Sequence, residues 1–321
     1  MNRRVKVAGI TIAASITFTA PAPAADVVKI TVGQRGNWDT AITHLGSKAG
    51  IFKKHGIELE MLYTSGSGET LQPVIAGSVD AGLAIGTLGA ISAFAKGAPV
   101  RIIAAQATGA ADYWYAKTTS PIKTLRDTDG KTIAFSTKGS STDSIVRAFI
   151  SEFGLKARPM PTGNPSATLT AVMTDQVDVG WASPPFGLKE IADGKIRVIA
   201  KGTDAALVRG QTIRVVVANA QALDKRRDVI RRFMRAYRES IDYMYSDNPQ
   251  VIKDYAEFVG VPEAMARRVR DEFFPKSLLY PDEIKGLEPL LKEAIELKFI
   301  SAPLTPDQLK ELVQLQPTAT N

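Results

Sequence analysis

The sequence contains no cysteine among its 321 residues and only two histidines, His44 and His55. The absence of cysteine excludes disulfide bonds, thiolate metal sites, a cysteine nucleophile and a lipid-anchored cysteine. His44 falls within a predicted helix and His55 in a predicted turn, so the two histidines are not spaced as a zinc-binding pair. We therefore expect no metal site.

Long apolar runs are also lacking, apart from one near the amino terminus. A basic segment at residues 3–6 precedes an apolar run at 7–20, and small residues with an A-x-A pattern follow at 22–24. These three regions are typical of a secretory signal peptide. We expect residues 1–25 to be removed and the mature protein to reside in the periplasm, without a lipid anchor.

A strong excess of charge is absent as well. The formal net charge is +7, and three basic residues belong to the expected leader, which leaves 7 − 3 = +4 for the mature chain. This modest charge is compatible with a small anionic ligand but is no evidence for one. Nucleic acid is not an expected partner of an exported protein. With 45% hydrophobic residues, the chain can build two cores.

Motifs of common enzyme classes are missing. Gly66-Ser67-Gly68 does not have the G-x-S-x-G spacing of a nucleophile elbow. Gly130-Lys131-Thr132 lacks the upstream glycine of a phosphate-binding P-loop. We therefore expect a protein that is not an enzyme and has no cofactor.

The sequence does contain a regular alternation of strand-like and helix-like segments. Short apolar or alternating runs are separated by small-residue loops and by helical patterns. This alternation predicts an α/β fold with a mostly parallel sheet, whose ligands bind at the carboxyl ends of the strands. The first expected strands are residues 29–33, 57–61, 79–85 and 100–105.

Residues 133–143 combine an apolar strand, a turn rich in glycine and hydroxyl groups, and a helix start. Ser140 to Asp143 are residue types that favour a helix N-cap, and Gly154 suits the C-cap. The free N–H groups and the dipole of such a helix start can hold an anion. An ordinary capped helix is the alternative interpretation.

An internal repeat indicates two similar units. Thr70-Leu71, Val74-Ile75 and Val79-Asp80 recur at one constant offset as Thr168-Leu169, Val172-Met173 and Val177-Asp178. The repeat predicts two lobes, each built on a similar α/β unit. Asp80 and Asp178 should have the same role, which we expect to be that of turn or cap residues.

Two extended segments, residues 113–117 and 212–218, are interpreted as the strands by which the chain crosses between the lobes. Two crossings form a hinge, and a hinge between lobes gives a cleft that can close. We predict lobe 1 at 26–115 plus 212–321 and lobe 2 at 116–211.

Beyond residue 223 the pattern is helical. The arginine-rich segment 225–238 carries apolar residues at helical spacing, which favours an amphipathic helix with a solvated basic face. A face that docks on a transporter is the alternative.

Several short motifs occur together in one order. They are Gly50-Ile51-Phe52-Lys53-Lys54-His55-Gly56-Ile57-Glu58-Leu59, Ala76-Gly77-Ser78-Val79-Asp80, Gly97-Ala98-Pro99-Val100, Pro121-Ile122-Lys123-Thr124-Leu125, Asp129-Gly130-Lys131-Thr132-Ile133-Ala134 and the Gly139-Ser140 turn. As a set they resemble the nitrate/sulfonate/taurine class of periplasmic solute-binding proteins that serve ABC importers, over residues 28–245. The resemblance implies a two-lobed type II periplasmic binding fold, an ABC permease as partner and a small ligand between the lobes. We expect a monomer.

The resemblance places ligand contacts at residues 37–39, 65–68 and 136–141, and helix starts near Asp39, Ser67, Thr87 and Ser140 favour an anionic or zwitterionic ligand. Asp39 pairs with a ligand amine or caps its helix, and the rings of Trp38, Trp181 and Phe186 stack on the ligand or pack in the core. The candidate residues are Asn37, Trp38, Asp39, Ser65, Gly66, Ser67, Gly86, Thr87, Ser136, Gly139, Ser140, Ser141, Asn164, Trp181 and Ser183.

The chain departs from the family at Ser183-Pro184-Pro185, where relatives often carry an acidic residue before proline. This departure leaves the ligand class open among sulfonate, taurine, nitrate and carboxylate types. A flat heterocycle such as a pyrimidine precursor is an alternative ligand. An exported enzyme of the same fold that acts on a small acid is an alternative function.

Overall fold

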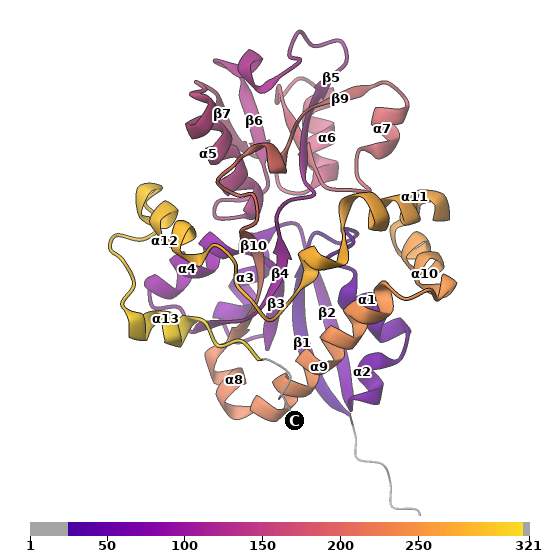
Figure 1. The fold of residues 1–321 in the computed structure, drawn as a ribbon, viewed down its shortest axis with the longest axis vertical. Helices are drawn as coiled ribbons and strands as arrows, with labels where there is room; N and C mark the ends of the chain where they lie inside the picture. Colours follow the sequence, from indigo (N-terminus) through magenta and orange to yellow (C-terminus); the bar gives the residue numbers. More distant parts are fainter. Residues whose placement is uncertain (1–24, 317–321) are drawn as a thin grey trace, which may run out of the picture.

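A computed structural model describes residues 25–316 (Figure 1). The predicted leader therefore lies outside the described residues, except for its last residue. Two α/β parts lie one above the other: strands β5 to β9 with helices α5 to α7 form the upper part, and the remaining elements form the lower part. Between residues 25 and 316, none of the helices combines the length and apolarity needed to cross a bilayer.

The lower part is built on a five-stranded sheet in the order β2-β1-β3-β10-β4. β1 pairs in parallel with β2 and with β3, whereas β10 pairs antiparallel with β3 and β4. The strands are β1 (Asp26–Gly33), β2 (Ile57–Thr64), β3 (Ala81–Gly86), β4 (Val100–Thr108) and β10 (Thr212–Asn219).

The upper part repeats this topology. Its strands form the ladders β8-β5-β9 and β6-β7, and an isolated bridge between Ile133 and Val179 joins β6 to β8 in parallel. The resulting order, β7-β6-β8-β5-β9, matches the lower sheet strand for strand, including the antiparallel fourth strand. These strands are β5 (Tyr113–Lys117), β6 (Thr132–Phe135), β7 (Arg158–Pro161), β8 (Gly180–Ala182) and β9 (Ile196–Lys201).

The sequence repeat coincides with this structural repeat. Helix α3 (Ser67–Ile75) and helix α6 (Pro165–Met173) occupy corresponding places. The hydroxyl groups of Thr64 and Thr70 lie 2.7 Å apart, and those of Thr162 and Thr168 lie 2.6 Å apart. The same side-chain bond thus fixes the loop before each helix.

The two repeat aspartates also have the same role. A carboxylate oxygen of Asp80 accepts the Lys29 N–H at 2.9 Å, and one of Asp178 accepts the Thr132 N–H at 2.9 Å. Each aspartate therefore ties the turn before one strand to the neighbouring strand, which confirms the prediction of a structural role.

The chain passes from one sheet to the other at residues 109–112 and 202–211. The segments expected as crossing strands, β5 and β10, begin where these passages end, and each then runs as an inner strand of its sheet. The lobe boundaries at 115/116 and 211/212 stay a prediction.

Helices cover both sheets, and their packing follows their apolar faces. In α9 the buried residues include Ile230, Phe233, Tyr237 and Ile241, as the sequence predicts. The other helices of the lower part are α1 (Ile42–Lys48), α2 (Ile51–Lys54), α4 (Thr87–Ala95), α8 (Ala220–Lys225), α9 (Arg227–Met244), α10 (Pro249–Val259), α11 (Glu263–Arg268), α12 (Leu287–Glu296) and α13 (Pro306–Leu312). The other helices of the upper part are α5 (Ser141–Phe153) and α7 (Leu188–Ala192).

Candidate ligand-binding site

Within the loop after β1, residues 36–40 are buried although several of them are polar. Asn37, Trp38 and Asp39 each have 0% exposed surface. The indole N–H of Trp38 donates to the Tyr245 hydroxyl at 3.0 Å, and the ring packs edge-on against Tyr245 and Tyr255. Trp38 therefore packs in the core of the lower part, which is one of the two roles that the sequence left open.

Asp39 belongs to a buried charge cluster. Arg214 donates from Nη1 to Asp39 Oδ2 at 2.9 Å, from Nη2 to both oxygens of Asp112 at 2.8 Å, and from Nε to Ser141 Oγ at 3.1 Å. Helix α1 begins later, at Ile42, without a side-chain cap. The expectation that Asp39 caps this helix is therefore wrong: its carboxylate pairs with an arginine instead.

The cluster joins the lower part of the molecule, lobe 1, to the upper part, lobe 2. In it, the carboxyl groups of Asp39 and Asp112 share the guanidinium of Arg214. Burial raises the pKa of the Asp112 carboxyl, the Arg214 charge opposes this rise, and Asp39 adds to it. Burial alone would lower the pKa of Arg214, but Asp112 and Asp39 outweigh it and hold that pKa above its usual range. With both carboxyls ionised the cluster carries a net charge of −1.

Several buried polar atoms near the junction of the two parts have no hydrogen-bond partner within residues 25–316. Such atoms are rare in folded proteins, because each costs about 1–3 kcal/mol when it is left unsatisfied. They are Asn37 Nδ2 and Oδ1, Asp39 Oδ1, Trp181 Nε1 and Ser183 Oγ.

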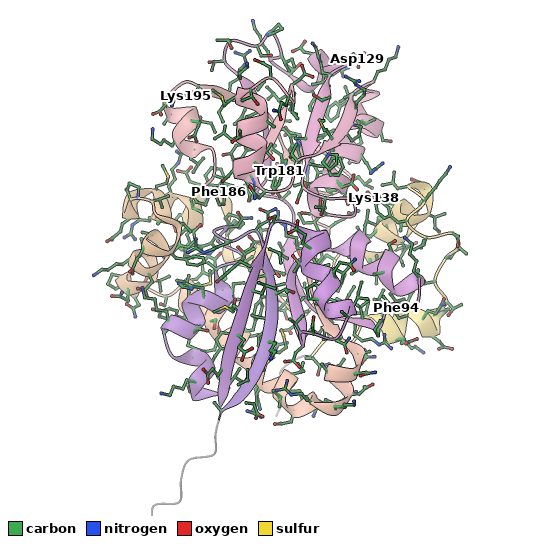
Figure 2. All side chains as sticks on the ribbon, turned by 180° about the vertical axis from the view of Figure 1, so that it is seen from behind. Phe94, Asp129, Lys138, Trp181, Phe186 and Lys195 are labelled. Carbon is green, nitrogen blue, oxygen red and sulfur yellow. The ribbon has the colours of Figure 1, made fainter. Side chains whose placement is uncertain are left out.

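These atoms come from the loop after β1, from strand β8 and from the turn that follows β8. A Cβ atom added to Gly36 would lie 3.1 Å from the ring of Phe186, so the loop after β1 touches the turn after β8. Figure 2 shows Trp181 and Phe186 at the level where the upper and lower parts meet. The arrangement therefore places the loop that contains Asn37 and Asp39 next to the turn that begins at Ser183.

Three further contacts join the lobes next to the predicted helix starts. Gln34 Nε2 donates to Ser136 Oγ of lobe 2 at 3.3 Å and, within lobe 1, to Ser65 O at 2.7 Å. The Gly68 N–H donates to Thr137 Oγ1 at 3.2 Å, and the Gly89 N–H donates to Gly139 O at 3.1 Å. Atoms of lobe 2 thus bind N–H groups at the starts of α3 and α4, where the sequence analysis predicts contacts with an anionic ligand.

Contacts within lobe 1 also involve residues at these two helix starts. The Gly86 N–H donates to Ser67 Oγ at 2.8 Å, and Thr87 Oγ1 donates to Thr212 O at 2.6 Å. A Cβ on Gly86 would lie 2.8 Å from Ser140 Cα, and one on Gly66 would lie 2.5 Å from Ser136 Oγ. These glycines therefore allow the lobes to approach each other closely at the starts of α3 and α4.

The start of α5 is capped as predicted. Ser140 Oγ accepts the Asp143 N–H at 3.2 Å, and Gly154 ends the helix in the left-handed conformation. Asn164 caps α6 by accepting the Ala167 N–H at 2.9 Å, and Pro165 is the first residue of the helix. These polar groups are used in capping, and Ser141 is the one that reaches the buried charge cluster.

Asp112 is a member of the cluster that sequence reasoning missed. In the sequence, Asp112 is distinguished only as a single acidic residue that follows Gly109-Ala110-Ala111 and directly precedes β5. Arg214, near the start of β10, lies where the two lobes meet, since its side chain reaches Ser141 of α5.

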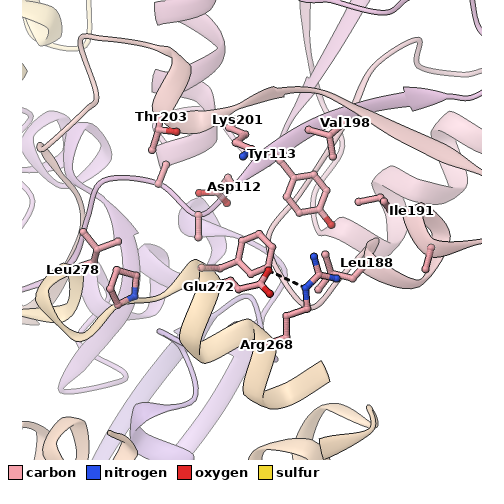
Figure 3. A pocket seen from close by; sticks show the side chains of 15 residues that line it. Asp112, Tyr113, Leu188, Ile191, Val198, Lys201, Thr203, Arg268, Glu272 and Leu278 are labelled. Atoms are coloured by element: carbon pink, nitrogen blue, oxygen red, sulfur yellow. Dashed lines mark hydrogen bonds and ion pairs between the residues drawn. The ribbon is translucent and has the colours of Figure 1, made fainter. Parts of the chain in front are cut away.

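A larger pocket of about 610 Å³ lies beside the two crossings (Figure 3). Asp112 and Tyr113 line it on one side, and Arg268 and Glu272, paired at 2.9 Å, line it on the other. The pocket is lined by none of Asn37, Asp39, Trp181 and Ser183, so it is separate from the buried polar atoms.

Comparison with known proteins identifies the family. Residues 37–251 match the family described as NMT1/THI5 like, and the chain belongs to it. A protein of Brucella abortus whose name describes it as a binding protein is 26% identical over 256 residues, which cover 78% of this chain and 77% of that protein.

Solved structures show the same fold. The alkanesulfonate-binding protein SsuA of Xanthomonas axonopodis pv. citri has a TM-score of 0.71 and 20% identity, with 87% of this chain and 92% of that chain covered. The periplasmic nitrate-binding protein NrtA of Synechocystis has a TM-score of 0.70 and 14% identity, with 91% and 87% covered. The two-lobed periplasmic binding fold is thus confirmed.

Proposed function

We propose that this chain is a periplasmic solute-binding protein that encloses a small ligand between its lobes and delivers it to an ABC importer. Membership of the family, the fold of its structural neighbours and the buried polar atoms at the lobe junction support this proposal. The protein returns the ligand unchanged and acts as a monomer.

We infer the ligand class from the donors and acceptors among the buried unpaired atoms. Asp39 Oδ1 is an acceptor and needs a donor, whereas Asn37 Nδ2 and Trp181 Nε1 are donors and need acceptors. Asn37 Oδ1 is a second acceptor without a donor, and Ser183 Oγ can both donate and accept. A ligand that satisfies these atoms presents an N–H or ammonium group to Asp39 and oxygen or ring-nitrogen acceptors to Trp181 and Ser183.

The charge cluster acts in the same direction. Two carboxyl groups already share one guanidinium, so a second anion would compete with them in a buried site, where Coulomb interactions are strong. Among the expected ligands, a zwitterion such as taurine or a flat heterocycle with amino and ring-nitrogen groups is therefore favoured over nitrate or a simple carboxylate.

Thermal unfolding of the mature chain against a ligand panel tests this proposal. A compound at 100 times its Kd stabilises the folded state by about 2.7 kcal/mol. We expect taurine or an aminopyrimidine to raise the Tm and nitrate to leave it unchanged. The bound compound should be recovered intact.

The variant Asp39→Asn sharpens this test. The amide keeps the shape but removes the charge, so affinity for the donor-bearing ligand should fall at least about tenfold, since a charged hydrogen bond is worth about 1.5–3 kcal/mol. Asp242→Asn, at an exposed residue of α9, is the control. Binding of nitrate alone, or tighter anion binding without loss of the other ligands in Asp39→Asn, would overturn the proposed ligand class.

A further inference from the structure

Glu293 on α12 is a buried carboxyl group without a partner. The residue is 4% exposed, and neither Oε1 nor Oε2 has a hydrogen-bond partner within residues 25–316. Asp39, in contrast, has one oxygen bound to Arg214. Because an ionised carboxylate requires donors or water, this position penalises the charged form.

Elements of both lobes surround Glu293. On its lobe-1 side α12 packs against α4, whose nine residues contain no titratable side chain. On the other side, Asp143 and Arg147 of α5 are the charged groups of lobe 2 that act on the carboxyl. The ring of Phe299, just after α12, lies 3.4 Å from the place of a Cβ on Gly139, directly before α5.

The arginine of this group is already paired. Asp143 Oδ1 accepts from Arg147 Nε at 2.8 Å, and Asp143 Oδ2 accepts the Gly139 N–H at 2.8 Å. On its own helix, Glu293 has Glu296 as a neighbour, which is exposed and lies 4.0 Å from Lys292. Across the lobe contact, Glu293 therefore lies in the field of the Asp143 carboxylate. The nearby Arg147 is paired with Asp143 and not with Glu293.

Burial and the charge of Asp143, opposed by Arg147, raise the pKa of Glu293 to about 7. When the lobes separate, Asp143 moves away and water reaches this face of α12, so the pKa returns toward its ordinary value of 4.5. The contact between the lobes and the proton on Glu293 are then thermodynamically linked.

We propose that Glu293 is a proton-binding site at the lobe contact, so that closing the lobes takes up a proton and alkaline pH favours opening. The closed arrangement is the one described, with the Gly68–Thr137 and Gly89–Gly139 bonds formed. The inference rests on the lobe closure that the proposed function requires, and it makes ligand capture and release sensitive to pH.

The sign follows from the raised pKa in the closed state. Below pH 4.5 the carboxyl is protonated in both states and has no effect on their ratio. As pH rises, the open state ionises first, and the closed state loses stability progressively until the pH passes about 7. The two pKa values differ by 7 − 4.5 = 2.5, which limits the total change in the closed-to-open ratio to about 300-fold.

Part of the raised pKa persists in the open state, because α4 still covers the side chain. Between pH 5.5 and 8.5 we therefore expect the closed-to-open ratio to fall about tenfold.

The test uses the absence of native cysteine. Cysteines introduced at exposed Glu58 and Lys123, one on each lobe, carry a fluorophore pair that reports the distance between the lobes. In the parent and in Glu296→Gln the closed-to-open ratio should fall about tenfold from pH 5.5 to 8.5. In Glu293→Gln it should stay constant, because the amide cannot ionise.

A ratio that does not change with pH in the parent, or an unchanged pH dependence in Glu293→Gln, would overturn the proposal. Should Glu293→Gln fail to fold, a carboxyl-carbon NMR titration of the parent chain decides the matter. A pKa near 7 for Glu293 supports the proposal, and a pKa of about 5 or below overturns it. Neither measurement needs a ligand, so either can fail while the proposed solute binding holds.

Discussion

The two lobes have the same strand order but contribute different chemistry to their junction. The loop after β1 and the start of β10 supply Asn37, Asp39 and Arg214, whereas the end of β8 supplies Trp181 and Ser183. Charge is thus concentrated on one side, and neutral polar groups are on the other. A duplicated framework can hold an asymmetric junction because these residues lie in loops or at strand ends, where the repeated sheet constrains their identity least.

The largest effect on stability is expected from removing the positive charge that lobe 1 contributes to the cluster. In Arg214→Met, Asp39 and Asp112 are left as buried carboxylates without a counter-charge, and loss of one partner of a buried pair costs about 3–5 kcal/mol. Urea unfolding should show this loss of stability. Arg235→Met, at an exposed position on α9, is the control and should change stability by less than about 0.5 kcal/mol.

An unchanged unfolding free energy in Arg214→Met would show that the two carboxylates are accommodated in another way, by protonation or by water. Adding Asp112→Asn to Arg214→Met should recover part of the loss, because one of the uncompensated charges is removed.

The framework of this protein was predictable to a large extent from sequence. The constant offset between Thr70-Leu71 and Thr168-Leu169 identified the duplicated unit. In the structure, the threonine pairs and the repeat aspartates make equivalent hydrogen bonds in the two lobes. The caps at Ser140 and Asn164 also followed from local chemistry. Local patterns of this kind report on contacts between residues close in sequence.

The site was less predictable, for a physical reason. The sequence indicated free helix starts near Ser67 and Thr87, but it could not show that Thr137 and Gly139 would bind there when the lobes meet. The partnership of Asp39 with Arg214 spans 175 residues, and local patterns carry no information about such a contact.

An intermediate effect is expected from the close approach of the lobes at Gly86. Its φ of −59° suits alanine, but the added methyl group would meet Ser140 at 2.8 Å. Gly86→Ala should therefore disfavour the closed arrangement by about 1–3 kcal/mol. The distance between the lobes, measured as above, is the readout.

Gly68→Ala is the matched control at the same lobe contact, because its methyl group would lie 3.6 Å from Thr137 Oγ1, an ordinary contact. It should leave the ratio of closed to open molecules near that of the parent. Equal behaviour of the two variants would mean that the lobes do not meet at Gly86 in solution.

The smallest effects test the symmetry of the repeat. Asp80 and Asp178 accept equivalent backbone N–H groups, but Asp80 also pairs with Arg226 at 2.7 Å, whereas Asp178 lies 3.7 Å from the half-exposed Lys131. Asp80→Asn should therefore cost about 2 kcal/mol and Asp178→Asn about 1 kcal/mol, since hydrogen bonds to charged groups are worth about 1.5–3 kcal/mol when well buried and less near water.

The pH dependence of Asp178 refines this comparison. Partial burial alone would raise the pKa of its carboxyl, but the N–H and hydroxyl groups of Thr132 outweigh burial and lower the pKa below 3.8. A lowered pKa contributes stability that is present above pH 3.8 and lost as pH falls through the folded-state value. Asp178→Asn should therefore weaken the protein at pH 7, and its difference from the parent should shrink as the pH falls below 3.8, as measured by urea unfolding at a series of pH values. A constant difference across this range would mean that the lost contact acts through packing, because a packing contribution does not titrate.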